Sequence, residues 1–159
     1  MFRDMRRTKQ NMSQERCIEV LERGTSGVLA VLGDEDYPYA VPLSYVYKDS
    51  KIYFHCAKEG HKIDAIVKHN KVSFCVIDQD KVVPEDYTTH YRSVIVFGKA
   101  RILEGEEKKT SLTELTLKYA PEDEQKRLDT IDENLDHVCM VSVDIEHMSG
   151  KEARDIAQG

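Results

Sequence analysis

With 159 residues, the chain is long enough to bury a hydrophobic core and short enough for one domain, which we expect over residues 1–159. Its balance of 40% hydrophobic and 33% charged residues excludes a disordered chain, and its net charge of -6 argues against a general nucleic-acid binder. The N-terminus lacks a secretory signal, no apolar run is long enough to span a membrane, and the four cysteines are scattered, so we expect a cytoplasmic protein.

The first third of the chain predicts one helix and then a meander of three strands. Ser13 is a suitable cap for a helix that runs to about Arg23, and Gly24 is a suitable stop. Strands follow at residues 27–32, 39–47 and 51–57, separated by turn-forming residues. Pro42 removes a backbone donor from the second of these strands, which should therefore lie at a sheet edge or carry a bulge.

The rest of the chain alternates helices and strands. In chain order we predict a helix, two strands, two helices and a strand at residues 60–70, 72–77, 91–103, 106–119, 121–133 and 138–147. The polar stretch 78–90 should be a loop, and the tail 150–159, which has little to bury, should be loose. Six mostly meandering strands with flanking helices indicate an α+β fold built on a small antiparallel barrel.

The segment between the strand 51–57 and the following helix is the strongest candidate for a binding site. Gly60 permits close backbone approach, and Lys62 lies in the first turn of the predicted helix. Free N–H groups, the helix dipole and a lysine together suit a phosphate group. The alternative is that Gly60 is an ordinary turn glycine and Lys62 a solvated surface residue.

His55 is the second candidate. Strand alternation places it with Tyr53, on the face opposite Phe54 and Cys56. A histidine near an anion site could donate a proton or contact a substrate, and a hydrogen-bonded structural histidine is the alternative. The spacing of His55, Cys56 and His61 matches no zinc pattern, so we expect no metal site.

The order of these segments resembles the pyridoxamine 5'-phosphate oxidase-like FMN-binding split barrels, in particular the branch of the nitroimidazole-resistance proteins. Each segment is weak alone, whereas their order and spacing along nearly the whole chain are fairly specific. The segments that carry the resemblance are 5–7, 27–30, 38–45, 52–57, 60–62, 91–100 and 149–151.

The resemblance implies an FMN cofactor and a set of residues that hold it. It places the strand from Val41 to Tyr45 along the flavin ring, His61 and Lys62 at the phosphate, and Ser93 at a flavin bound by the partner subunit. Met148 falls near the position of an aromatic residue beside the ring, and His55 matches a substrate-pocket histidine, our candidate catalytic residue. The complete implied FMN site is Val41, Pro42, Leu43, Ser44, Tyr45, His55, Ala57, Gly60, His61, Lys62, Ser93, Val94 and Met148.

Departures from the family pattern limit what the resemblance implies about substrates. His61 replaces an arginine of the oxidases, and their C-terminal arginine motif for pyridoxal phosphate is not visible. One hypothesis is therefore an FMN-dependent oxidoreductase that passes electrons to a small molecule such as a nitroaromatic or a quinone. The other hypothesis is a flavin, deazaflavin or haem carrier or sensor without turnover.

A homodimer with the flavin site at its interface is the expected assembly. Alternation in the predicted strand 91–103 places Ser93, Ile95 and Phe97 on one face and Val94 and Val96 on the other. Both faces are largely apolar, so the inner face can fill the barrel and the outer face can pack against a second copy. The alternative is that the predicted helix 106–119 covers the outer face.

Overall fold

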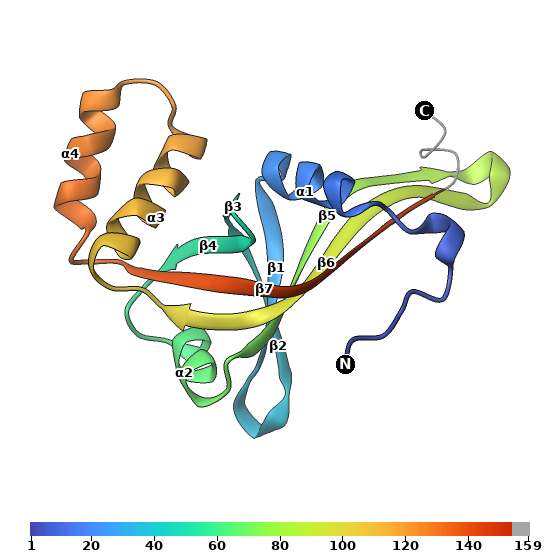
Figure 1. Ribbon diagram of the computed structural model, residues 1–159, viewed down its shortest axis with the longest axis horizontal. Helices are drawn as coiled ribbons and strands as arrows, with labels where there is room; N and C mark the ends of the chain where they lie inside the picture. Colours follow the sequence, from blue (N-terminus) through green and yellow to red (C-terminus); the bar gives the residue numbers. More distant parts are fainter. Residues whose placement is uncertain (154–159) are drawn as a thin grey trace.

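A computed structural model describes residues 1–153, which form a seven-stranded sheet with four α-helices (Figure 1). The elements in chain order are α1 (Gln14–Arg23), β1 (Ser26–Leu32), β2 (Pro38–Ser44), β3 (Val46–Lys48), β4 (Lys51–Cys56), α2 (His61–Lys68), β5 (Lys71–Val83), β6 (Thr88–Ile102), α3 (Gly105–Tyr119), α4 (Glu124–Asn134) and β7 (Cys139–Glu152).

The strand order explains why the sheet closes on itself. It is β2-β1-β5-β6-β7-β4-β3, with antiparallel pairing throughout. The two edge strands, β2 and β3, are consecutive in the chain and only Tyr45 separates them. The sheet must therefore curl until its edges approach each other, which produces the predicted α+β split barrel. As predicted, the strand that contains Pro42 lies at an edge.

The main core fills the inside of this curled sheet. Alternate residues of each strand point inward, and Leu29, Phe54, Phe74, Val96 and Val141 are each at most 1% exposed. Helix α1 closes one end of the barrel with the apolar side formed by Cys17, Val20 and Leu21. Its N-terminus is capped by Ser13, whose side chain accepts the N–H of Arg16, as the sequence indicates.

Helices α3 and α4 form a second layer outside the barrel. Leu112, Leu115 and Ile131 pack with Met140 of β7 and Val46 of β3 in a separate apolar cluster. Helix α3 contacts β3, β4 and β7, and Figure 1 shows the α3–α4 pair at the β4 side of the sheet. The alternative in which this helix covers the outer face of β6 is therefore wrong.

Two segments that the sequence predicts as irregular belong to strands. Residues 78–83 extend β5 and residues 88–90 begin β6, and the resulting hairpin projects from the barrel as an arm (Figure 1). Strand β7 runs to Glu152 rather than ending at His147, so residues 150–152 are not part of a loose tail. The rest of the predicted tail, from 154 onward, lies outside the described residues.

A chain of ion pairs explains why β7 continues so far. The carboxylate of Glu152, with 5% of its side chain exposed, accepts hydrogen bonds from Arg16 of α1 and Arg92 of β6. Arg92 also donates to Asp78, which accepts two hydrogen bonds from Arg23. The end of β7 is thereby joined to α1, β5 and β6.

Within residues 1–153, no helix is both long and apolar enough to cross a membrane.

Candidate functional site

Five strands present a row of small and apolar side chains on the outer face of the sheet. The register places Pro42 of β2 opposite Val28 of β1, and the row continues through Cys75, Ile95 and Ser149. Val28 and Ile95 remain 37% and 42% exposed. Neighbouring rows add further residues of the same kind, and we call the whole set the open sheet face: Val28, Ala30, Ala40, Pro42, Cys75, Ile77, Ser93, Ile95, Phe97 and Ser149.

The N-terminal segment covers one end of the open sheet face. The ring of Phe2 stacks on Phe97, with ring centroids 5.4 Å apart, and on His147 at 4.8 Å. A pocket of about 600 Å³ lies between this segment and the strands β1, β5 and β6. The other end, around Ile77, which is 65% exposed, carries no such cover.

The predicted site residues of β2, β6 and β7, together with Tyr45, divide between the two faces of the sheet. Pro42, Ser44 and Ser93 point outward and belong to the open sheet face or border it. Their neighbours in the chain point inward, because side chains alternate along a strand. The inward set consists of Val41, Leu43 and Met148, which are partly buried against the main core, and Tyr45 and Val94, which are 0% exposed.

Tyr45 differs most from its predicted role along the flavin ring. Its hydroxyl donates to the carbonyl of Leu21 at 2.7 Å, inside the core, and burial raises the pKa of this phenol well above its ordinary value. Its N–H donates to the hydroxyl of Tyr119, and its carbonyl accepts from Lys118 and lies 2.6 Å from the same hydroxyl. Neither the side chain nor the backbone of Tyr45 is free for a ligand.

The turn from β4 to α2 has the backbone geometry of an anion site. Gly60 precedes α2 with φ +139 and ψ 172, a conformation that is open to glycine and strained for other residues. No side chain caps the helix, so its first N–H groups receive no side-chain acceptor and remain available to donate to a ligand. Lys62 lies in this first turn, and its Nζ is 5.8 Å from the ring centroid of Phe54. The structure thus confirms the predicted glycine before a helix with a lysine in its first turn, and phosphate binding at this turn stays a prediction.

His61 has a structural contact that the sequence does not reveal. Its Nε2 accepts the N–H of Asp34 at 3.2 Å, and its ring stacks on Tyr39 of β2 at 4.3 Å. The imidazole therefore fixes the β1–β2 turn against α2. The same contact brings the start of β2 to the start of α2, so β2 connects the open sheet face with the β4–α2 turn.

His55 lies on the other side of β4 from Lys62. It is exposed and pairs with Met140, whereas Phe54, which Lys62 contacts, points into the barrel. The structure therefore does not bring His55 and Lys62 together, and Ala57 follows the end of β4 as an exposed residue. Within residues 1–153 no group of three His, Cys, Asp or Glu side chains could hold a metal ion.

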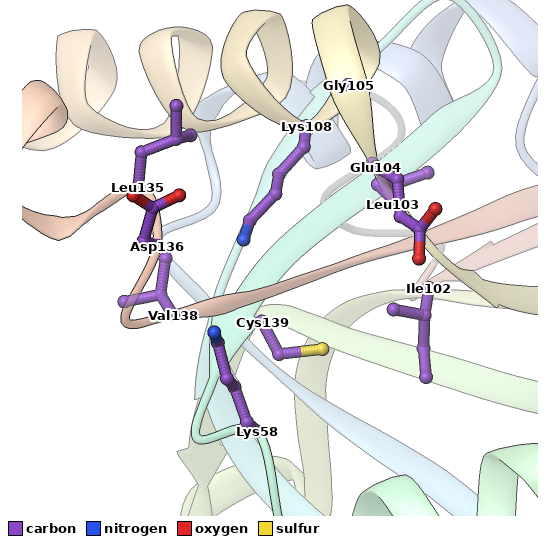
Figure 2. A pocket seen from close by; sticks show the side chains of 10 residues that line it. All are labelled: Lys58, Ile102, Leu103, Glu104, Gly105, Lys108, Leu135, Asp136, Val138 and Cys139. Atoms are coloured by element: carbon purple, nitrogen blue, oxygen red, sulfur yellow. The ribbon is translucent and has the colours of Figure 1, made fainter.

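A second pocket, which the sequence did not indicate, lies where the last residue of β6 and the first residue of β7 meet α3. It has a volume of about 470 Å³, and Lys58 and Lys108 extend their ammonium groups toward each other across it (Figure 2). Its wall includes Leu103, Leu135 and the thiol of Cys139. The lining residues come from three separate parts of the chain, at 58, 102–108 and 135–139, so no local pattern could have indicated the pocket.

Comparison with known proteins agrees with this architecture. Residues 13–152 match the model of the family described as pyridoxamine 5'-phosphate oxidase. A proposed 5-nitroimidazole antibiotic resistance protein from Bacteroides thetaiotaomicron is 23% identical, with 89% of this chain and 85% of that chain covered and a TM-score of 0.77. No curated protein sequence matches the chain significantly.

Two further similar structures are those of FAD-binding proteins. An FAD-binding protein from Mesorhizobium loti is 26% identical, with 90% and 96% of the two chains covered and a TM-score of 0.64. An FAD- and haem-binding protein from Mycobacterium smegmatis is 19% identical, with 94% and 80% covered and a TM-score of 0.75. The family match spans most of the chain, and the fold agrees with it. The chain therefore belongs to the pyridoxamine 5'-phosphate oxidase family.

Proposed function

We propose that the protein binds FMN, with the flavin ring along β2 and the open sheet face and the phosphate at the start of α2. The observation that carries this proposal is the open sheet face itself. A planar aromatic ring system gains most from a flat apolar surface with few bulky side chains, and this face offers proline, alanine, serine and valine. The flavin-binding proteins among the similar structures support the same cofactor class.

The phosphate position is supported by charge and by connectivity. Lys62 supplies a cation in the first turn of a helix whose first N–H groups have no intrahelical acceptor. Tyr39 and His61 hold the start of β2 against this helix, so one ligand can follow β2 from the phosphate to the ring. Since β2 is an edge strand, its outer N–H and C=O groups are available for the polar edge of a flavin.

We further propose that a second copy of the chain covers the open sheet face and shares the flavin site. An apolar surface that spans five strands is unusual for a monomer, and isologous packing would bury it twice. Ser93, on this face, would then contact the flavin that the other subunit holds. FMN supplies the redox chemistry when bound, and the protein supplies orientation and exclusion of water.

The proposed reaction is electron transfer to a small oxidant such as a nitroaromatic or a quinone. In this proposal His55 contacts substrate rather than FMN, since its exposed side chain lies on the opposite face of β4 from Lys62. An assay of nicotinamide-nucleotide oxidation with several acceptors tests turnover. Bound flavin without consumption of any donor would instead favour a carrier or sensor.

Titration of FMN into apoprotein tests the cofactor site. Lys62→Ala removes one charge-assisted phosphate contact, so we expect the Kd for FMN to rise about 10- to 100-fold. Lys68→Ala, which removes the same charge from the other end of α2, is the matched control and should bind like the wild type. Wild-type affinity in Lys62→Ala would remove Lys62 from the site, and a purified protein without flavin absorbance or FMN binding would refute the proposed cofactor.

A further inference from the structure

Two cysteines face each other across the β4–β7 pair. Cys56 is the last residue of β4, Cys139 is the first residue of β7, and the register makes them direct partners. They are adjacent on the same pleat, so both side chains point to the inner face of the sheet. The other two cysteines, Cys17 and Cys75, have no cysteine opposite them.

The hydrogen-bond pattern of this strand pair fixes the spacing between the two backbones. Ile145 donates its N–H to the carbonyl of Ser50, directly before the first partners of the ladder. Hydrogen-bonded pairs recur at every second position of an antiparallel ladder, so Cys56 and Cys139 are such a pair. Their Cα atoms are expected to be about 5.5 Å apart, a separation that disulfides span, and the wider side-chain spacing of such a pair would leave the bond strained and therefore easily reduced.

The pair is also accessible to small molecules. Cys139 is only 7% exposed, yet its thiol forms part of the wall of the pocket between β6, β7 and α3 and faces into it (Figure 2). Cys56 is half-buried directly beside it. A small disulfide that enters this pocket therefore reaches one thiol while the second stands next to it.

We propose that Cys56 and Cys139 form a reversible cross-strand disulfide, with a small disulfide as the oxidant. The Cys139 thiolate attacks one sulfur of the oxidant and releases one small thiolate, which leaves a mixed disulfide on Cys139. The Cys56 thiolate then attacks the Cys139 sulfur and releases the second small thiolate. The two protein thiols are oxidised, the oxidant is reduced to two thiols, and a reductant reverses both steps.

The environment sets the speed of this reaction. Burial, and next the neighbouring Cys139 thiol, raise the pKa of the Cys56 thiol to about 11, whereas Lys62 acts in the opposite direction. The Cys56 thiolate is therefore scarce near neutral pH, and we expect the second step, which closes the internal link, to take minutes to hours. The bond would close a loop from 56 to 139 and tie the start of the β4–α2 turn to the start of β7.

Oxidation of the reduced full-length chain by oxidised 2-mercaptoethanol tests the proposal. Free thiols should fall from four to two, the mass should fall by about 2 Da without an adduct, and peptide mapping should recover the Cys56–Cys139 link. The melting temperature should rise by about 5–10 °C, because the bond constrains a long loop in the unfolded chain. A reductant should restore all four thiols.

Single variants show whether the link is specific. Cys75→Ser and Cys17→Ser should still lose two thiols, whereas Cys56→Ser should lose none to an internal link and should retain a mixed disulfide on Cys139. Four free thiols in the treated wild type would overturn the proposal, and so would an inter-chain bond through Cys75. Near-ultraviolet circular dichroism identifies any variant that has not folded. The thiol count and the peptide map of the wild type test the proposal even if a variant fails to fold.

Discussion

At the scale of single residues, Asp78 is the centre of the charged chain that joins α1 to the arm. Its carboxylate accepts hydrogen bonds from Arg23 at 2.8 and 2.7 Å and from Arg92 at 3.0 Å, and its side chain is only 12% exposed. The hydrogen bonds from Arg23, and then the one from Arg92, lower the pKa of Asp78 below its ordinary value despite burial. The folded state therefore favours the ionised form.

Asp78→Asn should destabilise the protein by about 1.5–3 kcal/mol at pH 7, since the amide cannot replace the charge that faces two guanidinium groups. A carboxyl group with a lowered folded pKa stabilises the fold above its unfolded pKa, and this contribution disappears as the pH falls through the folded pKa. The difference between wild type and variant should thus shrink below about pH 4. Urea unfolding at several pH values measures it.

The control for this prediction lies in the same hairpin. Asp86 is exposed in the turn between β5 and β6, so Asp86→Asn should leave the urea midpoint near that of the wild type at each pH. A pH-independent difference between wild type and Asp78→Asn would show that packing, rather than the charge of Asp78, stabilises the fold.

At the scale of secondary structure, Gly60 allows the β4–α2 turn to keep its shape. A Cβ at Gly60 or at Gly105 would meet no atom within 4 Å, so space does not distinguish the two glycines. Their backbones do, because Gly60 has φ +139 and Gly105 has φ +62, which lies in the left-handed region that other residues can enter.

Gly60→Ala should therefore cost about 1–3 kcal/mol in stability and weaken FMN binding through the displaced α2 N-terminus. Gly105→Ala should cost about 1 kcal/mol and leave FMN affinity unchanged. Urea unfolding and FMN titration of the two variants provide the comparison. Equal losses of stability in both would contradict the strain that we assign to Gly60.

The sequence predicted the helices and most strands because their patterns are local. The sequence pattern joined β2 and β3 into one strand. The break between them at Tyr45 depends on hydrogen bonds with Lys118 and Tyr119, which lie more than 70 residues further along the chain. It missed the arm, whose residues are exposed or half-buried on both faces and carry no apolar alternation. It also missed the end of β7, which long-range ion pairs to Glu152 hold in place.

The same distinction applies to the site. Alternation correctly placed Ser93 with Ile95 and separated His55 from Phe54. It could not show that Ser93 and Pro42 share one surface, because the strand order that relates them is a property of the whole sheet. The resemblance named Tyr45 and Val94 by position in the chain, and burial leaves neither side chain free to meet a ligand.

At the scale of the whole molecule, the open sheet face is the surface on which the proposed dimer depends. Ile95→Glu places a charge at its centre, so we expect a monomer that has also lost affinity for FMN. Leu128→Glu is the matched control, because Leu128 on α4 has the same 42% exposure as Ile95 and lies on the second layer.

Sedimentation equilibrium of both variants and the wild type decides the question. The wild type and Leu128→Glu should be dimers at micromolar concentration. A wild-type monomer that binds FMN tightly would refute the shared site and the role of Ser93, and a dimeric Ile95→Glu would place the interface elsewhere.

The position of β7 in the sheet has a consequence for the protein during its synthesis. This strand is the last of the seven along the described chain, yet it lies between β6 and β4 and pairs with both. Until the ribosome has released it, β6 and β3–β4 have no partner to join them, and both present open edges to other chains. The barrel therefore cannot close before β7 has left the ribosome, and ribosome-bound chains that end before β7 should depend on chaperones.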